Sequence, residues 1–170
     1  MRVLRTSKKR IGTLKASVVK EVEQRGEVKI SIDKEGDVEI IGNDGGHEWI
    51  AEQVLKAILE GFLPPKAYKL FSDEVFLDII DLDASFYRKD NQIGRAKSRI
   101  IGEGGSAKKK IEELTGTFIN ISSKNQVAII GTFEDLKIAK EGLLRILEGA
   151  PHTSVYKYLE NQNKKNKVFL

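Results

Sequence analysis

An internal repeat restricts the fold of this chain more than any other feature of its sequence. Val28–Gly42 and Thr117–Gly131 align at an offset of 89 residues, with six of fifteen positions identical. Ile50–Gly61 and Ile138–Gly149 align at an offset of 88, with seven of twelve identical. The chain has 170 residues, so each copy has roughly 80, which is enough for a compact module. The repeat therefore predicts two copies of one small module rather than a single large domain.

Each copy has the pattern of a β-hairpin followed by a helix. Apolar and polar residues alternate in 30–32 and in 119–121, as they do in half-buried strands. Apolar residues then recur at helical spacing in 50–58 and in 136–146. A strand and two short helices are expected before each hairpin. The predicted fold is α+β, with the order strand, helix, helix, strand, strand, helix in both copies.

The boundary between the copies is predicted at Leu63–Lys66. Two prolines there end the first long helix and fix a stiff connection. The expected modules are residues 1–66 and 67–160, the second including a short C-terminal helix in Pro151–Glu160. Asn161–Leu170 is polar and basic, and it is expected to be a disordered tail.

The two copies differ upstream of the hairpin. Ile11–Lys15 matches Ile93–Lys97 at an offset of 82, whereas Ser17–Glu23 matches Ser106–Glu112 at 89. The change in offset predicts that the first copy lacks seven residues. The missing segment corresponds to Ser98–Gly104, which contains most of a glycine-rich sequence in the second copy.

This glycine-rich sequence has the chemistry of a phosphate-binding loop. Gly102, Gly104 and Gly105 let the backbone take left-handed conformations and pass close to a sugar-phosphate chain. Ser106 is expected to cap the next helix, whose free N–H groups would face the phosphates. The basic candidates for contact are Arg95, Lys97, Arg99, Lys108 and Lys109. Glu103 lies within the loop and weighs against tight binding, because a carboxylate repels phosphate.

Two other interpretations of the glycines are open. Gly102-x-Gly104-x-x-Ala107 formally fits the dinucleotide-binding pattern, but the residues before it are basic and helix-like instead of a buried strand. No cofactor is therefore expected. A purely structural glycine turn remains the main alternative.

The composition argues against an enzyme and against a metal protein. The chain has no cysteine, and its two histidines, His47 and His152, have no nucleophile or ligand cluster nearby in the sequence. Asp78, Asp81 and Asp83 resemble a metal-dependent nuclease site only superficially, since their spacing suits one strand and its exit turn. No apolar run is long enough to span a membrane, and no signal peptide is recognisable at Met1. A cytoplasmic protein is expected.

The loop Gly102-Glu103-Gly104-Gly105 resembles the Gly-x-x-Gly signature of the KH domain. That resemblance implies a loop that clamps about four unpaired nucleotides over a groove floored by aliphatic side chains. By position, Ile101, Ile119 and Ile121 are the candidates for the floor.

Longer stretches resemble the archaeal form of the partner-of-Nob family of small-subunit ribosome assembly factors. They are Arg99–Gly105, Ile111–Gly116, Val127–Gly131 and Glu148–Tyr156. The resemblance spans nearly all of the chain and implies two tandem type I KH modules, each a three-stranded sheet covered by three helices, of which the first is degenerate. It also implies binding to single-stranded rRNA near the small-subunit 3′ end, with a PIN-domain endonuclease and the rRNA dimethyladenosine transferase as partners. The expected function is a non-enzymatic RNA-binding adaptor. The alternative is a protein-interaction scaffold that binds no RNA directly.

Overall fold

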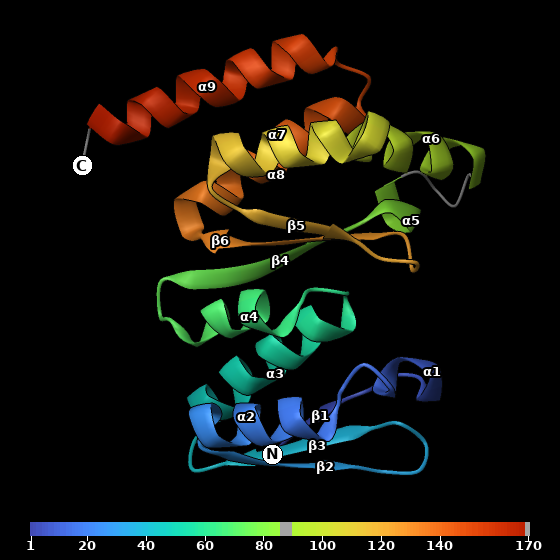
Figure 1. Cartoon of the computed structure of the whole chain (residues 1–170), viewed down its shortest axis with the longest axis vertical. Helices are drawn as coiled ribbons and strands as arrows, with labels where there is room; N and C mark the ends of the chain where they lie inside the picture. The colour runs from blue at the N-terminus through green and yellow to red at the C-terminus, as the bar shows by residue number, and fades with distance from the viewer. Residues whose placement is uncertain (86–89, 169–170) are drawn as a thin grey trace. The chain divides into compact units, whose positions relative to one another are not determined.

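A computed structural model describes residues 1–85 and 90–168, and it divides the chain into two compact units. Unit 1 is Met1–Val75 and unit 2 is Phe76–Leu170 (Figure 1). The division falls after Val75, whereas the sequence predicted it at Lys66.

Unit 1 is a three-stranded antiparallel sheet with helices packed on one face (Figure 1). The strand order is β1-β3-β2, so β2 is an edge strand. Its elements are β1 (Arg2–Leu4), α1 (Lys8–Ile11), α2 (Ala16–Gly26), β2 (Val28–Ile32), β3 (Val38–Gly42), α3 (Gly45–Leu59), α4 (Pro64–Ala67) and the 3-10 helix η1 (Tyr68–Phe71). The first six follow the predicted order, and α4 and η1 are additional.

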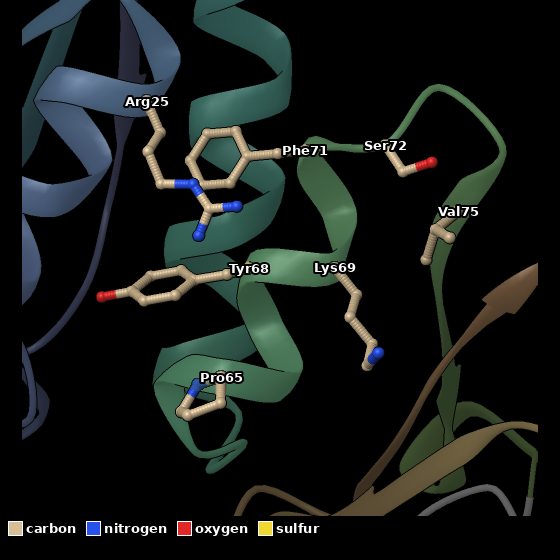
Figure 2. Close-up of a pocket in the computed structure, with 7 residues that line it drawn as sticks. All are labelled: Arg25, Pro65, Tyr68, Lys69, Phe71, Ser72 and Val75. Carbon is tan, nitrogen blue, oxygen red and sulfur yellow. The ribbon is translucent and has the colours of Figure 1, made fainter.

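The segment after α4 packs onto unit 1 through an aromatic and cationic cluster. The guanidinium of Arg25, on α2, lies 5.2 Å from the ring centre of Tyr68 and 4.9 Å from that of Phe71. Figure 2 shows this guanidinium between the two rings, at a pocket of about 660 Å³. Ala67 and Leu70, which belong to the same segment of the chain, are buried. Burial also raises the pKa of Tyr68, with a smaller contribution from Glu21. These contacts explain why the boundary lies beyond Lys66.

Unit 2 repeats the same order and adds the short helices α5 and η2 and a C-terminal helix. Its strands have the order β4-β6-β5, with β5 at an edge. Its elements are β4 (Val75–Asp81), α5 (Leu82–Ser85), α6 (Asp90–Ile101), the 3-10 helix η2 (Glu103–Gly105), α7 (Ser106–Thr115), β5 (Phe118–Ile121), β6 (Gln126–Thr132), α8 (Phe133–Leu147) and α9 (His152–Val168). The two hairpin turns contain Gly36 at φ 106° and Asn125 at φ 57°, two residue types that tolerate this left-handed backbone.

The C-terminal helix α9 is longer than the sequence predicted. Val155 and Leu159 are buried and Tyr156 packs partly against the core, so these residues form its inward face. The helix continues through Asn161 to Val168. The prediction that the segment from Asn161 onward is disordered was therefore wrong for the residues that the structure describes.

The length difference between the copies lies upstream of the loop, between the start of the first strand and the end of the helix before the loop. Helix α1 has four residues, whereas α6 has twelve. Arg10 near the end of α1 donates to the carbonyl of Leu59 at 2.6 Å, and Arg99 near the end of α6 donates to that of Ile146 at 2.8 Å. The two arginines are 89 residues apart, the same offset as the hairpins, so Thr13–Ala16 takes the place of Gly102–Gly105. The predicted deletion of the loop was wrong, because the Ile-Gly-x-x-Lys match at an offset of 82 does not reflect structural equivalence.

Candidate nucleic-acid interface

The glycine loop of unit 2 joins α6 to α7 in a conformation that glycine alone adopts easily. Gly102 has φ 75° and ψ 174°, while Gly104 and Gly105 lie in the left-handed region with φ 60° and φ 80°. The loop is closed by the N–H of Gly102 donating to Ser98 at 2.9 Å and that of Gly105 donating to Gly102 at 3.2 Å. The sequence therefore specifies a fixed turn.

The glycines differ in what surrounds them. A Cβ built on Gly104 or Gly105 would meet nothing within 4 Å. A Cβ on Gly102 would lie 2.6 Å from the Cβ and the N of Ala107. Gly102 is thus required by the packing of the turn, whereas Gly104 and Gly105 leave an open surface that a ligand backbone can approach.

The loop leads directly into the N-terminus of α7. Gly105 is the residue before the helix, and it has no side chain that could cap the first turn. The prediction that Ser106 caps α7 was wrong, because Ser106 is already the first helical residue. The first turn of α7 nevertheless carries the positive end of a helix dipole at the exposed loop, which favours an anionic ligand.

The predicted basic residues lie along α6 and α7 on either side of the loop. Arg95 and Lys109 are exposed, and Lys97 and Lys108 are half-buried. Lys108 lies 3.6 Å from a carboxylate oxygen of Glu112, one helical turn further along α7. These side chains lie near the loop because α6 and α7 adjoin it in the sequence. Among the described residues, no long-range contact holds them there.

Arg99 has a different role from the one that the sequence predicted. Its Nη1 donates to the carbonyl of Ile146 at 2.8 Å and its Nη2 to that of Ala150 at 2.6 Å. Both carbonyls belong to the C-terminal end of α8 or the turn after it, where backbone acceptors lack helical partners. The guanidinium therefore fastens α6 to α8, which makes Arg99 a structural residue beneath the loop.

The three predicted floor residues are exposed to different degrees. Ile101, directly before the loop, is 37% exposed and is available to a ligand. Ile121 is partly buried against the core. Ile119 is only 2% exposed and belongs to the hydrophobic core. Ile119 is thus a core residue and does not form the exposed floor that the sequence predicted.

Glu112 is a site-adjacent residue that the sequence analysis passed over. Its Oε1 accepts a hydrogen bond of 2.8 Å from the N–H of Ile119 on the edge strand β5. Glu23 accepts the equivalent bond of 2.8 Å from Ile30 on β2. The sequence did contain a sign of this role, because Glu23 and Glu112 are 89 residues apart, the same offset as the hairpins. A glutamate at this position can accept a hydrogen bond from an N–H on the outer side of an edge strand.

The other sequence candidates do not converge on a second site. Asp78 pairs with Lys140 at 3.1 Å, while Asp83 accepts from the side chain of Asn125 at 3.1 Å. His47 lies 2.8 Å from Asp44 on the surface of unit 1. The described residues include no group of three or more His, Cys, Asp or Glu side chains placed to hold a metal. No helix in the described part of the chain is long and apolar enough to cross a membrane.

The equivalent region of unit 1 keeps a groove but not the open loop. A cavity of about 650 Å³ is lined by α2 and β2, with Ile30 and Ile41 on its wall and Lys20 at its edge. In the loop, however, Leu14 stands where unit 2 has Glu103, and Leu14 is buried. A side chain thus anchors the turn that glycines leave open in unit 2.

A family model of the second KH domain of PNO1, described as "Eukaryotic type KH-domain (KH-domain type I)", matches residues 76–164. This match begins at the first residue of unit 2. A KH domain-containing protein of Methanocaldococcus jannaschii is 40% identical over 97% of this chain and 75% of its own length. The RNA-binding protein PNO1 of Oryzias latipes is 33% identical over 62% of this chain and 44% of its own. The pre-rRNA-processing protein pno1 of Schizosaccharomyces pombe is 29% identical over 52% and 36%.

A solved structure shares the whole architecture. It contains the archaeal Dim2p of Pyrococcus horikoshii in a complex with a/eIF2alpha and rRNA. The matching chain is 34% identical, with a TM-score of 0.87 over 96% of this chain and 94% of the other. The similarity therefore extends through both units and is not confined to the glycine loop.

Proposed function

The chain belongs to the PNO1 and Dim2p family of KH-domain ribosome assembly factors, and from that membership we propose that it binds single-stranded rRNA through the glycine loop of unit 2. The proposed target lies near the 3′ end of the small-subunit rRNA. The proposed role is that of a cytoplasmic adaptor that has no catalytic activity of its own.

The observation that carries this proposal is the loop itself. Gly104 and Gly105 are open on their outer side, and they lie at the positive end of the α7 dipole. Ile101 offers an exposed apolar surface next to them, and basic side chains of α6 and α7 flank them. This combination suits a phosphate backbone on one side and unpaired bases on the other.

We further propose that both units are type I KH modules and that unit 1 is the degenerate copy. The repeated element order supports this proposal. Arg10 in unit 1 and Arg99 in unit 2 each bind a backbone carbonyl near the end of the long helix of their own unit. Glu23 and Glu112 each accept a hydrogen bond from the edge strand of their own unit. A PIN-domain endonuclease and the rRNA dimethyladenosine transferase remain the proposed protein partners.

The test is a double substitution, Glu103→Asp with Gly104→Asp, in the full chain. It places a second carboxylate at the outer tip of the loop, where both residues are exposed, so the fold should persist while RNA binding is lost. The measurement is a titration with an unpaired oligonucleotide that carries the small-subunit rRNA 3′ sequence, together with thermal unfolding. Ser72→Asp with Glu74→Asp adds the same charge at an exposed segment of unit 1 and should leave the affinity unchanged.

A single substitution, Glu103→Lys, tests the same assignment in the opposite direction. It replaces a repelling charge with an attracting one, so binding should tighten and the salt slope should steepen by about one ion. Unchanged binding in the double-aspartate variant would mean that the RNA is not held at this loop. No RNA binding by the wild-type protein would favour the protein-interaction scaffold that binds no RNA directly.

A further inference from the structure

The helix before the loop is α1 in unit 1 and α6 in unit 2. Near its end, a backbone carbonyl, that of Arg10 or Arg99, has a different hydrogen-bond partner in each unit. In unit 1 the carbonyl of Arg10 accepts two bonds from Thr13, from its N–H at 3.1 Å and its hydroxyl at 2.7 Å. In unit 2 the residue equivalent to Thr13 is Gly102, which has no hydroxyl and whose N–H is directed to Ser98 instead. The carbonyl of Arg99 accepts a hydrogen bond of 2.7 Å from Nε2 of His152.

His152 belongs to α9, whereas in unit 1 the carbonyl of Arg10 is bonded by Thr13 of the neighbouring loop. His152 is the first residue of α9, and it lies 53 residues from Arg99 along the chain. A carbonyl oxygen can only accept, so the proton of this bond must be on Nε2 of the imidazole. The loop glycine thus removes a local hydrogen bond, and a distant histidine replaces it.

The helix that carries His152 is held firmly in place. Val155 and Leu159 are almost fully buried, and α9 packs on α7 and α8. A Cβ on Gly142 of α8 would lie 2.9 Å from Leu159, so the two helices meet closely. The guanidinium of Arg99 also bonds to Ala150, two residues before His152. Arg99 is therefore fixed from both its side chain and its carbonyl.

From this geometry we propose that His152 is a positioning residue for RNA binding, which holds the end of α6 so that the glycine loop keeps its binding conformation. The proposal rests on the assignment of RNA binding to that loop. It gives the C-terminal helix a function beyond covering the core. It also explains why the histidine follows directly after Gly149-Ala150-Pro151, the turn whose carbonyl Arg99 binds.

Substitutions of His152 in the full chain test this proposal. His152→Ala and His152→Asn should weaken RNA binding by about three- to tenfold, the factor expected for one neutral hydrogen bond. His152→Gln should retain most of the affinity, because its amide nitrogen reaches to about the position of Nε2 and can donate. The matched control is Thr13→Val, which removes the hydroxyl bond to the carbonyl of Arg10 in unit 1 and should leave RNA affinity unchanged.

Amide hydrogen exchange of residues 102–106 in the free protein provides a second readout. It should accelerate in the alanine and asparagine variants and not in the glutamine variant. If exchange and affinity were unchanged while the melting temperature fell, His152 would only attach α9, and the proposal would be overturned. If the alanine variant did not fold, the contrast between asparagine and glutamine would decide. If wild-type protein bound no RNA, the proposed function would fail, and the exchange of the loop would still report whether His152 positions it.

Discussion

The glycines of the loop separate the requirements of folding from those of binding. At Gly102 the backbone has φ 75°, and a side chain would collide with Ala107. Gly102→Ala should therefore lower the free energy of unfolding by about 2–4 kcal/mol. Gly104→Ala places a Cβ in open space at φ 60° and should cost only about 1 kcal/mol. Denaturant unfolding of the two variants checks this order.

The effect on RNA binding should differ from the effect on stability. The Cβ of Gly104→Ala would point into the space that the proposed sugar-phosphate backbone occupies. This variant should weaken RNA binding several-fold despite its nearly normal stability. Equal affinity of Gly104→Ala and wild type would argue that the RNA does not pass over this face of the loop.

A carboxylate in the hairpin of unit 1 should make stability depend on pH. Oδ1 of Asp33 accepts from the N–H groups of Glu35, Gly36 and Asp37 at 2.7–3.0 Å. These bonds, first those from Asp37 and Gly36, lower the pKa of Asp33. A lowered pKa in the folded state stabilises the protein above the pKa of the unfolded chain, and this contribution disappears as the pH falls through the folded value.

The corresponding variant is Asp33→Asn, which keeps an acceptor oxygen but has no charge. Its melting temperature should be lower than that of wild type at pH 7, and the difference should shrink as the pH falls below about 4. Asp73→Asn, an exposed carboxyl outside this turn, serves as the control. A difference that stays constant from pH 7 to pH 3 would contradict the charge-based explanation.

At the scale of helices and strands, periodicity was sufficient for most of the fold. Alternation in 30–32 and 119–121 predicted strands of both hairpins, and helical spacing predicted α3 and α8, because these patterns reflect burial on one face. Contacts between distant elements were not predictable. The basic character of Arg99 did not indicate that its guanidinium binds carbonyls 47 and 51 residues away. Alternation likewise predicts which face of the sheet Ile119 lies on, but it does not predict how completely other residues cover that face.

The C-terminal helix illustrates a second limit of the sequence. Its last residues are asparagines and lysines, and such a polar composition is typical of disorder. The buried anchors Val155 and Leu159 dock the first half of α9, and helix propagation beyond a docked segment requires no further apolar residue. The helix therefore extends past the point where hydrophobic periodicity ends.

A prediction at this scale concerns the docking of α9. Leu159→Ala removes a fully buried side chain and should lower the free energy of unfolding by about 2–5 kcal/mol. Deletion of Asn161–Leu170 should change it little, because both anchors precede that segment. Chemical denaturation of the two variants provides the measurement. A large loss of stability on deletion would mean that the end of α9 contributes more packing than its exposure indicates.

At the scale of the whole chain, the two units share their framework and differ at the loop. The shared contacts are the arginine that binds the third helix and the glutamate that protects the edge strand. The loop glycines of unit 2 are replaced in unit 1 by Thr13, Leu14, Lys15 and Ala16. This pattern separates the residues that build the module from those that bind a ligand, which underlies the proposed division of labour between the units.

The division of labour predicts different binding by the two units. Unit 1 keeps a groove and the exposed basic residues Lys15 and Lys20, so residues 1–75 should bind RNA weakly and independently of sequence. Residues 76–170 should retain most of the specific affinity of the full chain. The measurement is a titration of both fragments and the full chain with one unpaired rRNA oligonucleotide at two salt concentrations.

The fragment boundary at Val75 matters for this comparison, because a fragment ending at Lys66 would lack Tyr68, Leu70 and Phe71. Residues 1–66 should therefore melt at a lower temperature than residues 1–75, and poor binding by the shorter fragment would carry no information. In the longer fragment, Leu14 anchors the loop and no glycine opens it to a phosphate. Its binding should consequently rest on charge alone and vanish at moderate salt. Salt-resistant binding by residues 1–75 that equals that of residues 76–170 would show that the groove of unit 1 holds RNA without a glycine loop.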